Sequence, residues 1–205
     1  MAPDNSASPV DHALRIFRDA GGTLRAGQAR ARNVHPRTLS RMVDEGQLIR
    51  ISRGVYQLPG SPGGDPDLAV VALKVPTGVI CLISALALHE LTTQIPHAVH
   101  VALPHGTTPP KLSHPPIHYY RFSEASMAAG VEDREVSGTM IRVFDAPKSV
   151  ADCFKFRNKI GVDIAVETLR TYLRRRGASV DALLRHADVN RVRSVMMPYI
   201  EAVLG

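Results

Sequence analysis

The chain is poor in residues that several classes of protein require. It has no Trp, and aromatic residues make up only 5% of its 205 residues, which argues against a single-strand nucleic-acid binder that stacks bases on aromatic rings. Its two cysteines, Cys81 and Cys153, lie far apart in apolar segments and form no CxxC pair. Neither a zinc site nor a redox pair is therefore predicted, and free, buried thiols are typical of a reducing compartment.

Long apolar runs are also missing. The first residues, MAPDNSASPV, are polar and contain no apolar signal core. No apolar stretch approaches the roughly 20 residues that a transmembrane helix needs. We therefore expect a cytoplasmic protein without a membrane partner.

The sequence lacks the common signatures of enzymes. It contains no Gly-rich phosphate loop, no GxSxG motif and no HExxH motif. Glu132, Asp133, Glu135 and Asp145 lie near one another, but no Lys follows at the spacing of a nuclease site, so we expect a solvated turn before the strand at Thr139. Most of the nine histidines lie between residues 89 and 118, without the tight spacing of four zinc ligands. We expect no enzymatic activity, no cofactor and no metal.

What the chain does have is positive charge at both ends. The formal net charge is +6. Residues 1–60 carry +4, with nine Arg and no Lys, residues 61–149 carry −2, and residues 150–205 carry +4. Guanidinium groups present a planar fork of donors that suits phosphate and guanine. The distribution favours a polyanionic partner, with a general Arg-rich coding bias as the alternative.

Residues 10–60 follow the order helix, helix, turn, helix, hairpin. The apolar spacing of Val10, Ala13, Leu14 and Phe17 predicts a first helix that ends at the Gly21-Gly22 pair. A second helix is predicted over residues 24–32, a third from Pro36 to Gly46, and two strands over 48–51 and 55–58. This order is typical of a winged helix-turn-helix, preceded here by a disordered tail at residues 1–9.

A second domain is predicted after a Gly/Pro-rich linker at residues 61–66. In residues 67–205, apolar runs predict strands at 98–103, 117–122 and 139–144, and the pattern is helical from Pro147 onward. The fold class is therefore α+β, with an N-terminal winged helix-turn-helix followed by a mixed, helix-rich α+β body.

The third predicted helix has the two faces of a recognition helix. Leu39, Met42 and Val43 form an inner face, which leaves Arg37 and Arg41 on the outside to reach base edges in the major groove. Hairpin residues would meet the backbone or minor groove, and the second helix would contact phosphates. The predicted DNA-binding residues are Arg25, Arg30, Arg32, Arg37, Thr38, Ser40, Arg41, Arg50 and Arg53. The alternative is a solvated basic face on a winged helix that binds protein.

A second basic surface is predicted in the body, for a polyanion or a protein partner. It comprises Lys155, Lys159, Arg174, Arg175 and Arg176. The alternative for the Arg run is ordinary compensation of a helix dipole ahead of Gly177.

Three segments in order give the chain a resemblance to a known family. They are RTL at residues 37–39 with GQLIRISRGVY at 46–56, SALALHEL at 84–91, and APKSVADCF at 146–154. In these segments the chain resembles the AbiEi-family antitoxins of type IV, abortive-infection toxin–antitoxin systems. The similarity spans roughly residues 12–58 and 66–204 and is weakest over the His- and Pro-rich segment 104–136.

The resemblance implies a repressor that binds inverted repeats in its own operon through the winged helix, as a homodimer on double-stranded DNA. It further implies that the body counteracts a nucleotidyltransferase-like toxin encoded beside it, with or without a stable complex. Two other classes stay open: a stand-alone transcriptional regulator whose body senses a ligand or a protein, and an interaction adaptor that never touches DNA.

Overall fold

The computed structural model describes residues 8–60 and 65–205. The chain divides into two compact units, which are described separately. The N-terminal unit comprises Met1–Pro76 with Glu135–Ile141, and the C-terminal unit comprises Thr77–Arg134 with Arg142–Gly205.

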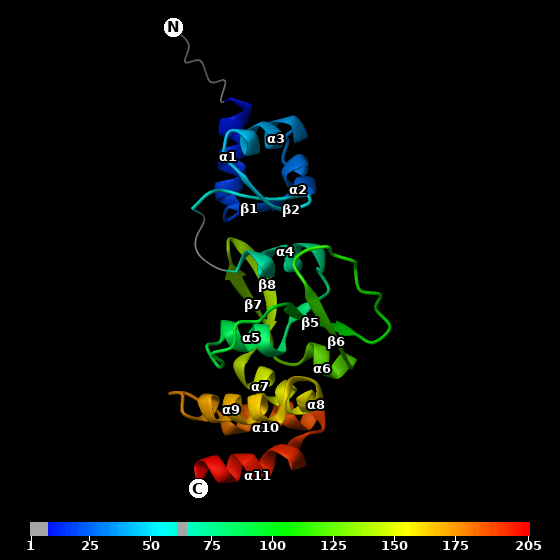
Figure 1. The fold of residues 1–205 in the computed structure, drawn as a ribbon, viewed down its shortest axis with the longest axis vertical. Helices are drawn as coiled ribbons and strands as arrows, with labels where there is room; N and C mark the ends of the chain where they lie inside the picture. The colour runs from blue at the N-terminus through cyan, green and yellow to red at the C-terminus, as the bar shows by residue number, and fades with distance from the viewer. Residues whose placement is uncertain (1–7, 61–64) are drawn as a thin grey trace. The chain divides into compact units, whose positions relative to one another are not determined.

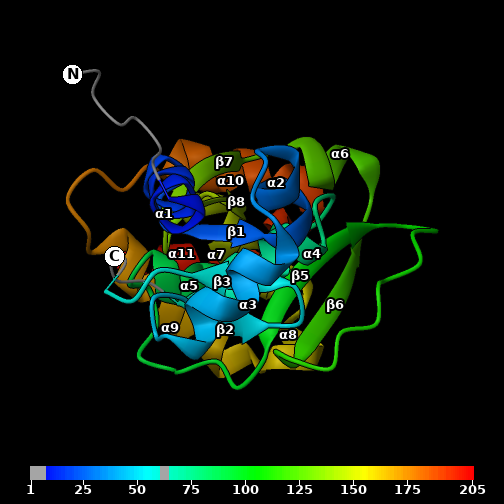
Figure 2. The same ribbon diagram turned by 90° about the horizontal axis from the view of Figure 1, so that it is seen from above.

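The N-terminal unit is built as a winged helix (Figures 1 and 2). Its elements are α1 (Pro9–Asp19), β1 (Thr23–Arg25), α2 (Ala26–Ala31), α3 (Pro36–Asp44), β2 (Ile49–Ser52), β3 (Val55–Gln57) and α4 (Pro66–Lys74). The strands form an antiparallel sheet in the order β1-β3-β2. The side chains that hold the helices together are Ala13, Phe17, Leu24, Ala29, Val34, Leu39, Met42 and Leu48, all buried. The predicted winged helix-turn-helix and the α+β class are confirmed.

The first helix begins earlier than predicted. Ser8 accepts a hydrogen bond from the Asp11 backbone N–H and donates its own N–H to the Asp11 carboxylate, and Pro9 is the first helical residue. This capping box satisfies two N–H groups that the helix itself cannot pair. The predicted tail at 1–9 is therefore wrong at residues 8 and 9, and residues 1–7 lie outside the described residues.

The start of the predicted second helix is a strand. Thr23, Leu24 and Arg25 pair with Gln57, Tyr56 and Val55 of β3, and α2 begins only at Ala26. Apolar periodicity did not reveal this because the pairing partners lie at least 30 residues away along the chain. Arg25 therefore lies at a strand end and not on the helix to which the sequence assigned it.

The structure also differs at the predicted linker. Residues 61–64 lie outside the described residues, but the Asp65 carboxylate accepts the Asp67 N–H at 2.9 Å and caps α4, whose first residue is Pro66. The compact N-terminal unit extends to Pro76, so α4 belongs with the winged helix and not with the body.

The C-terminal unit contains a five-stranded sheet in the order β6-β5-β4-β8-β7. The strands are β4 (Val79–Ile80), β5 (Val99–Pro104), β6 (Ile117–Phe122), β7 (Val131–Val136) and β8 (Thr139–Phe144). The β5–β6 and β4–β8 pairs are parallel, and the β4–β5 pair is antiparallel. The residues at the end of the β7–β8 hairpin, Glu135–Ile141, are grouped with the N-terminal unit.

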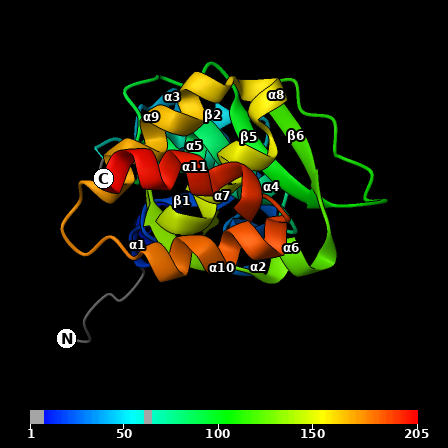
Figure 3. The ribbon, with the colours of Figure 1, turned by 90° about the horizontal axis from the view of Figure 1, so that it is seen from below.

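Helices supply the remainder of this unit (Figure 3). They are α5 (Leu82–Leu88), α6 (Glu124–Ala128), α7 (Ala146–Lys155), α8 (Arg157–Ile160), α9 (Val162–Leu173), α10 (Val180–Asn190) and α11 (Arg193–Leu204). The central helix is α7, which contacts α5, α9 and α10 and is buried from Lys148 to Phe154. Cys81 and Cys153 are both free and buried in this core, as the sequence predicted.

One local prediction in this unit is wrong. Glu132, Asp133 and Glu135 do not form a turn but lie exposed on β7. Charged residues on an edge strand are a common means of discouraging edge-to-edge association.

The buried His100 makes stability depend on pH. It stands opposite His118 in the β5–β6 register with the ring centroids 5.4 Å apart, and burial together with His118 lowers the pKa of His100 from 6.5 to about 4. The unfolded chain therefore binds this proton more readily than the folded chain, so stability falls as the pH drops from about 6.5 to about 4.

Replacing His100 with Phe is expected to remove this loss. Between those pH values, wild-type protein should lose roughly 1–3 kcal/mol of unfolding free energy more than His100→Phe does, measured by urea titration. His105→Phe, at an exposed loop position, should behave like wild type. Equal acid sensitivity of His100→Phe and wild type would contradict the assignment.

Among residues 8–60 and 65–205, none of the helices has the length and apolar character that crossing a bilayer requires.

Candidate nucleic-acid interface

The third helix presents one face to the core and one to solvent. Leu39 and Met42 are fully buried, whereas Arg37, Ser40 and Arg41 are exposed and Thr38 is half-buried. His35 caps the helix by accepting the Arg37 N–H on Nδ1 at 3.1 Å, and Pro36 follows it. Arg37 lies in the first turn of α3, the part of a recognition helix that contacts base edges, and Arg41 follows one turn later on the same face.

Thr38 lies with the two arginines in a small hollow. Arg37, Thr38 and Arg41 line a cavity of about 180 Å³ together with Pro9, the first residue of α1. The structure thus brings three of the residues predicted to bind DNA onto one concave surface. Pro9, which the sequence had placed in a tail, is the fourth member.

In the free protein Arg41 has an acidic neighbour. Its Nε lies 3.7 Å from Glu45 Oε1, one helical turn away, with the two side chains 54% and 47% exposed. Such i, i+4 pairs are worth only about 0.2–0.5 kcal/mol. Binding to DNA would therefore have to break only a weak contact.

We expect Glu45→Gln to raise DNA affinity by about twofold, because it releases Arg41 and removes a negative charge from the face that would meet phosphate. Fluorescence anisotropy with a labelled duplex measures this. Asp19→Asn, which removes an exposed acid at the end of α1, serves as the control and should change affinity less. An unchanged or lower affinity of Glu45→Gln would show that Glu45 does not restrain Arg41.

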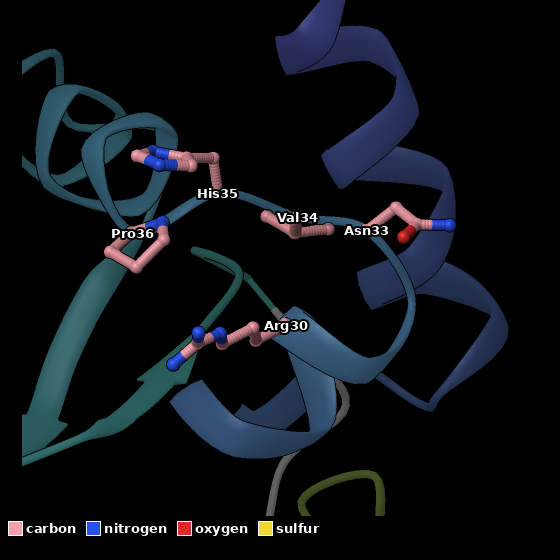
Figure 4. A pocket seen from close by; sticks show the side chains of 5 residues that line it. All are labelled: Arg30, Asn33, Val34, His35 and Pro36. Carbon is pink, nitrogen blue, oxygen red and sulfur yellow. The ribbon is translucent and has the colours of Figure 1, made fainter.

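The turn between α2 and α3 forms a larger pocket (Figure 4). It has a volume of about 470 Å³ and is lined by Arg30, Asn33, Val34, His35 and Pro36. Arg30 of α2 and Pro36 at the start of α3 lie across the pocket from each other. Asn33 has a φ of +63°, a left-handed conformation that Asn tolerates better than most residues. Arg32, exposed at the end of α2, lies next to this turn.

The wing is short and is held from two sides. β2 and β3 are joined by Arg53 and Gly54, and Gly54 has a φ of +73° that favours glycine. The Gly54 carbonyl accepts the Ala26 N–H at 2.9 Å, and the Arg53 carbonyl accepts a hydrogen bond from Lys74 Nζ at 2.7 Å. Arg53 is exposed on the turn, and Arg50 is exposed on β2.

Lys74 is not among the residues predicted from the sequence. It lies in the last turn of α4, where a cation compensates the helix dipole, and no sequence pattern connects it to a hairpin 20 residues earlier. Burial and the charges of Arg25 and Arg53 lower its pKa. The three cations therefore share one electrostatic environment at the wing.

The second predicted basic surface does not form one cluster. Lys155 lies 5.7 Å from the Phe122 ring, and Lys159 lies 5.9 Å from the Tyr120 ring. Lys159 precedes α9 and the Arg174–Arg176 run follows it, so the 12 residues of α9, about 18 Å of helix, separate the two groups. Arg175 contacts Glu90 at 4.0 Å. The five predicted residues therefore lie at the two ends of α9.

Within the part of the chain that the structure describes, no group of three or more His, Cys, Asp or Glu side chains could hold a metal ion. His100 and His118 are neighbours in the sheet without a third ligand of this kind.

Comparisons with known proteins agree with the winged helix. Residues 12–59 match the family model described as a transcriptional regulator, AbiEi antitoxin. No curated protein matches the chain. The crystal structure of the RV2827C protein from Mycobacterium tuberculosis is similar in fold, with a TM-score of 0.52 and 12% sequence identity, covering 92% of this chain and 79% of that one.

These findings confirm the resemblance over the winged helix. Residues 12–59 are similar to the transcriptional regulators that the AbiEi antitoxin family model describes. The matched residues include α2, α3 and the wing, so they contain each DNA-binding position that the sequence predicted. The similarity to the crystal structure extends over the C-terminal unit but concerns the fold alone.

Proposed function

We propose that the chain is an antitoxin that represses its own toxin–antitoxin operon through the winged helix and counteracts a nucleotidyltransferase-like toxin through the body. The observation that carries the proposal is the exposed face of α3. Arg37, Ser40 and Arg41 lie there within the segment that matches an AbiEi antitoxin regulator. The type IV, abortive-infection mode of action and a cytoplasmic location are part of the same proposal.

The contacts divide by role. Arg37 and Arg41 would reach base edges with Ser40 and Thr38 beside them, which gives specificity. Arg30 and Arg32 near the turn, together with Arg25, Arg50 and Arg53 at the sheet, would bind phosphates, which position the domain without reading sequence. A homodimer on an inverted repeat places one such domain on each half-site.

The body would provide the antitoxin activity. Lys155 and Lys159 form one candidate surface for a polyanion or partner, and Arg174, Arg175 and Arg176 form a second one at the other end of α9. The proposal gives the body no enzymatic step.

A ligand-sensing regulator is the second candidate function. It is favoured by a hollow of about 610 Å³ in the C-terminal unit, lined by residues 108–112 with Ile117 and Tyr119. This hollow lies in the Pro-rich segment for which the sequence offered no function. A small molecule bound there that changed DNA affinity would support this function over the antitoxin.

One full-length variant separates the two parts of the proposal. Arg37→Glu/Arg41→Glu reverses the charge on α3 without touching the C-terminal unit. With a reporter fused to the operon promoter, the variant should lose repression, while cells that also express the adjacent toxin gene should still survive when the antitoxin is supplied from a separate promoter. Retained repression would contradict the DNA-binding half, and lost protection by a folded variant would contradict the toxin half.

A further inference from the structure

A cation outside the family-matched segment completes the wing. Lys74 lies beyond residues 12–59, yet its ammonium group donates to the Arg53 carbonyl at 2.7 Å. Arg25 lies on the other side of the same turn, since it pairs with Val55 and the next residue, Ala26, donates to the Gly54 carbonyl. Three elements that are separate along the chain thus converge at one turn: β1, the wing and α4.

Convergence of three like charges is unfavourable unless something offsets it. Opposite charges within about 4–6 Å favour the charged form of a lysine, and like charges disfavour it. Burial is the largest influence that lowers the pKa of Lys74, followed by Arg25 and Arg53, and no acidic group opposes this effect. Among residues 8–60 and 65–205, no ion pair forms with Arg25, Arg53 or Lys74. A bound anion would relieve the repulsion.

The side chains of Arg25, Arg53 and Lys74 are accessible to an anion from solvent. Arg53 is exposed, and Arg25 and Lys74 are half-buried. One hydrogen of the Lys74 ammonium is used by the Arg53 carbonyl, which leaves further donors for a ligand. Lys74 can therefore fix the turn and contact an anion with the same group.

We propose that Arg25, Arg53 and Lys74 together bind one backbone phosphate of double-stranded DNA, with Lys74 as a direct ligand that lies outside the recognisable winged helix. The inference rests on the proposed DNA-binding function and deepens it, because it makes α4 part of the interface. The interface then extends past the linker predicted at residues 61–66.

The test uses full-length protein and a labelled random-sequence duplex of about 30 base pairs, three helical turns. Affinity is measured as a function of salt, since each phosphate contact adds about 0.9 to the slope of log K against log salt. Lys74→Gln should reduce the slope by about one unit and lower affinity by about eightfold at 0.1 M salt. Lys74→Arg should restore both. Arg185→Gln, which removes an exposed arginine from α10 of the C-terminal unit, should leave both unchanged.

A double variant distinguishes a direct ligand from a residue that only holds Arg53 in place. If Lys74 contacts phosphate itself, Arg53→Ala/Lys74→Gln should lose about two units of slope, against about one for Arg53→Ala alone. If the double variant equals Arg53→Ala, Lys74 acts only through Arg53 and the inference is wrong. Thermal unfolding of each variant verifies that the winged helix remains folded.

Failure of this inference differs from failure of the proposed function. If wild-type protein forms no salt-sensitive complex with the duplex, the DNA-binding function itself is wrong. If it does and α3 variants weaken binding while Lys74→Gln does not, only the role of Lys74 is overturned. If Arg25, Arg53 and Lys74 bound single-stranded RNA with the same affinity as duplex DNA, the assignment to duplex DNA would also be contradicted.

Discussion

Replacing Arg37 and Arg41 together with Ala is expected to lower affinity for the operator by at least about 30-fold. A bidentate contact between Arg and guanine is worth about 1–3 kcal/mol of discrimination, and two such contacts would be lost. Both side chains are exposed on α3, whose inner residues Leu39 and Met42 stay in the core. The substitutions should therefore leave the fold intact.

The measurement compares the operator with random-sequence DNA, because backbone contacts contribute to both and base contacts only to the first. The operator is the sequence protected by wild-type protein in a footprint of the DNA upstream of its gene. Affinity for random DNA should fall far less than affinity for the operator. Arg15→Ala/Arg18→Ala, which removes two exposed arginines from α1, is the matched control. Equal losses on both DNAs would show that α3 does not read sequence.

The second large effect concerns a charged pair in the core of the C-terminal unit. Lys148 and Asp152, one turn apart on α7, form an ion pair in which both side chains are fully buried. Asn190 donates to the same Asp152 oxygen at 2.6 Å and accepts from the Ser126 hydroxyl at 2.8 Å. The Lys148 ammonium also lies 4.1 Å from the centre of the Phe144 ring. Helices α6, α7 and α10 are thus joined by one polar network.

We expect Lys148→Met to cost about 3–5 kcal/mol of unfolding free energy, because it leaves a buried carboxylate without its partner. Burial already raises the pKa of Asp152, and Lys148 and Asn190 act against this shift. Asp152 Oδ2 has no hydrogen-bond partner among the described residues, so the carboxylate has little other compensation. Urea unfolding followed by circular dichroism gives the free-energy difference.

The double variant Lys148→Met/Asp152→Leu should recover most of this loss, since a buried ion pair can often be replaced by apolar residues at little cost. Arg193→Ala provides a surface control: it breaks the exposed pair with Asp188 and should cost at most about 1 kcal/mol. A double variant as unstable as Lys148→Met would argue that the network, and not the unpaired charge, determines stability.

The buried pair lies in one of the segments that carry the family resemblance. Lys148 and Asp152 belong to APKSVADCF at residues 146–154. In the structure, Lys148 to Phe154 are all buried in α7. A charged residue four positions from an opposite charge is compatible with a solvated face or with a buried pair, and only the surrounding helices distinguish the two.

By itself, the sequence determined the features that depend on local chemistry. The apolar spacing of Ala13 and Phe17, the Pro36 start of α3, the short hairpin around Gly54 and the exposed Arg37 and Arg41 all followed from helix periodicity, capping and turn preferences. These signals act over a few residues, so they can be recognised in the sequence without knowledge of the fold.

What only the tertiary structure decided depends on contacts between distant segments. The β1–β3 pairing moved Arg25 to the wing, α4 brought Lys74 to Arg53, and α9 separated Lys159 from Arg174. Burial makes Lys148 and Asp152 an ion pair in the core. None of these results has a local signature, because pairing partners and burial are set by how the whole chain packs.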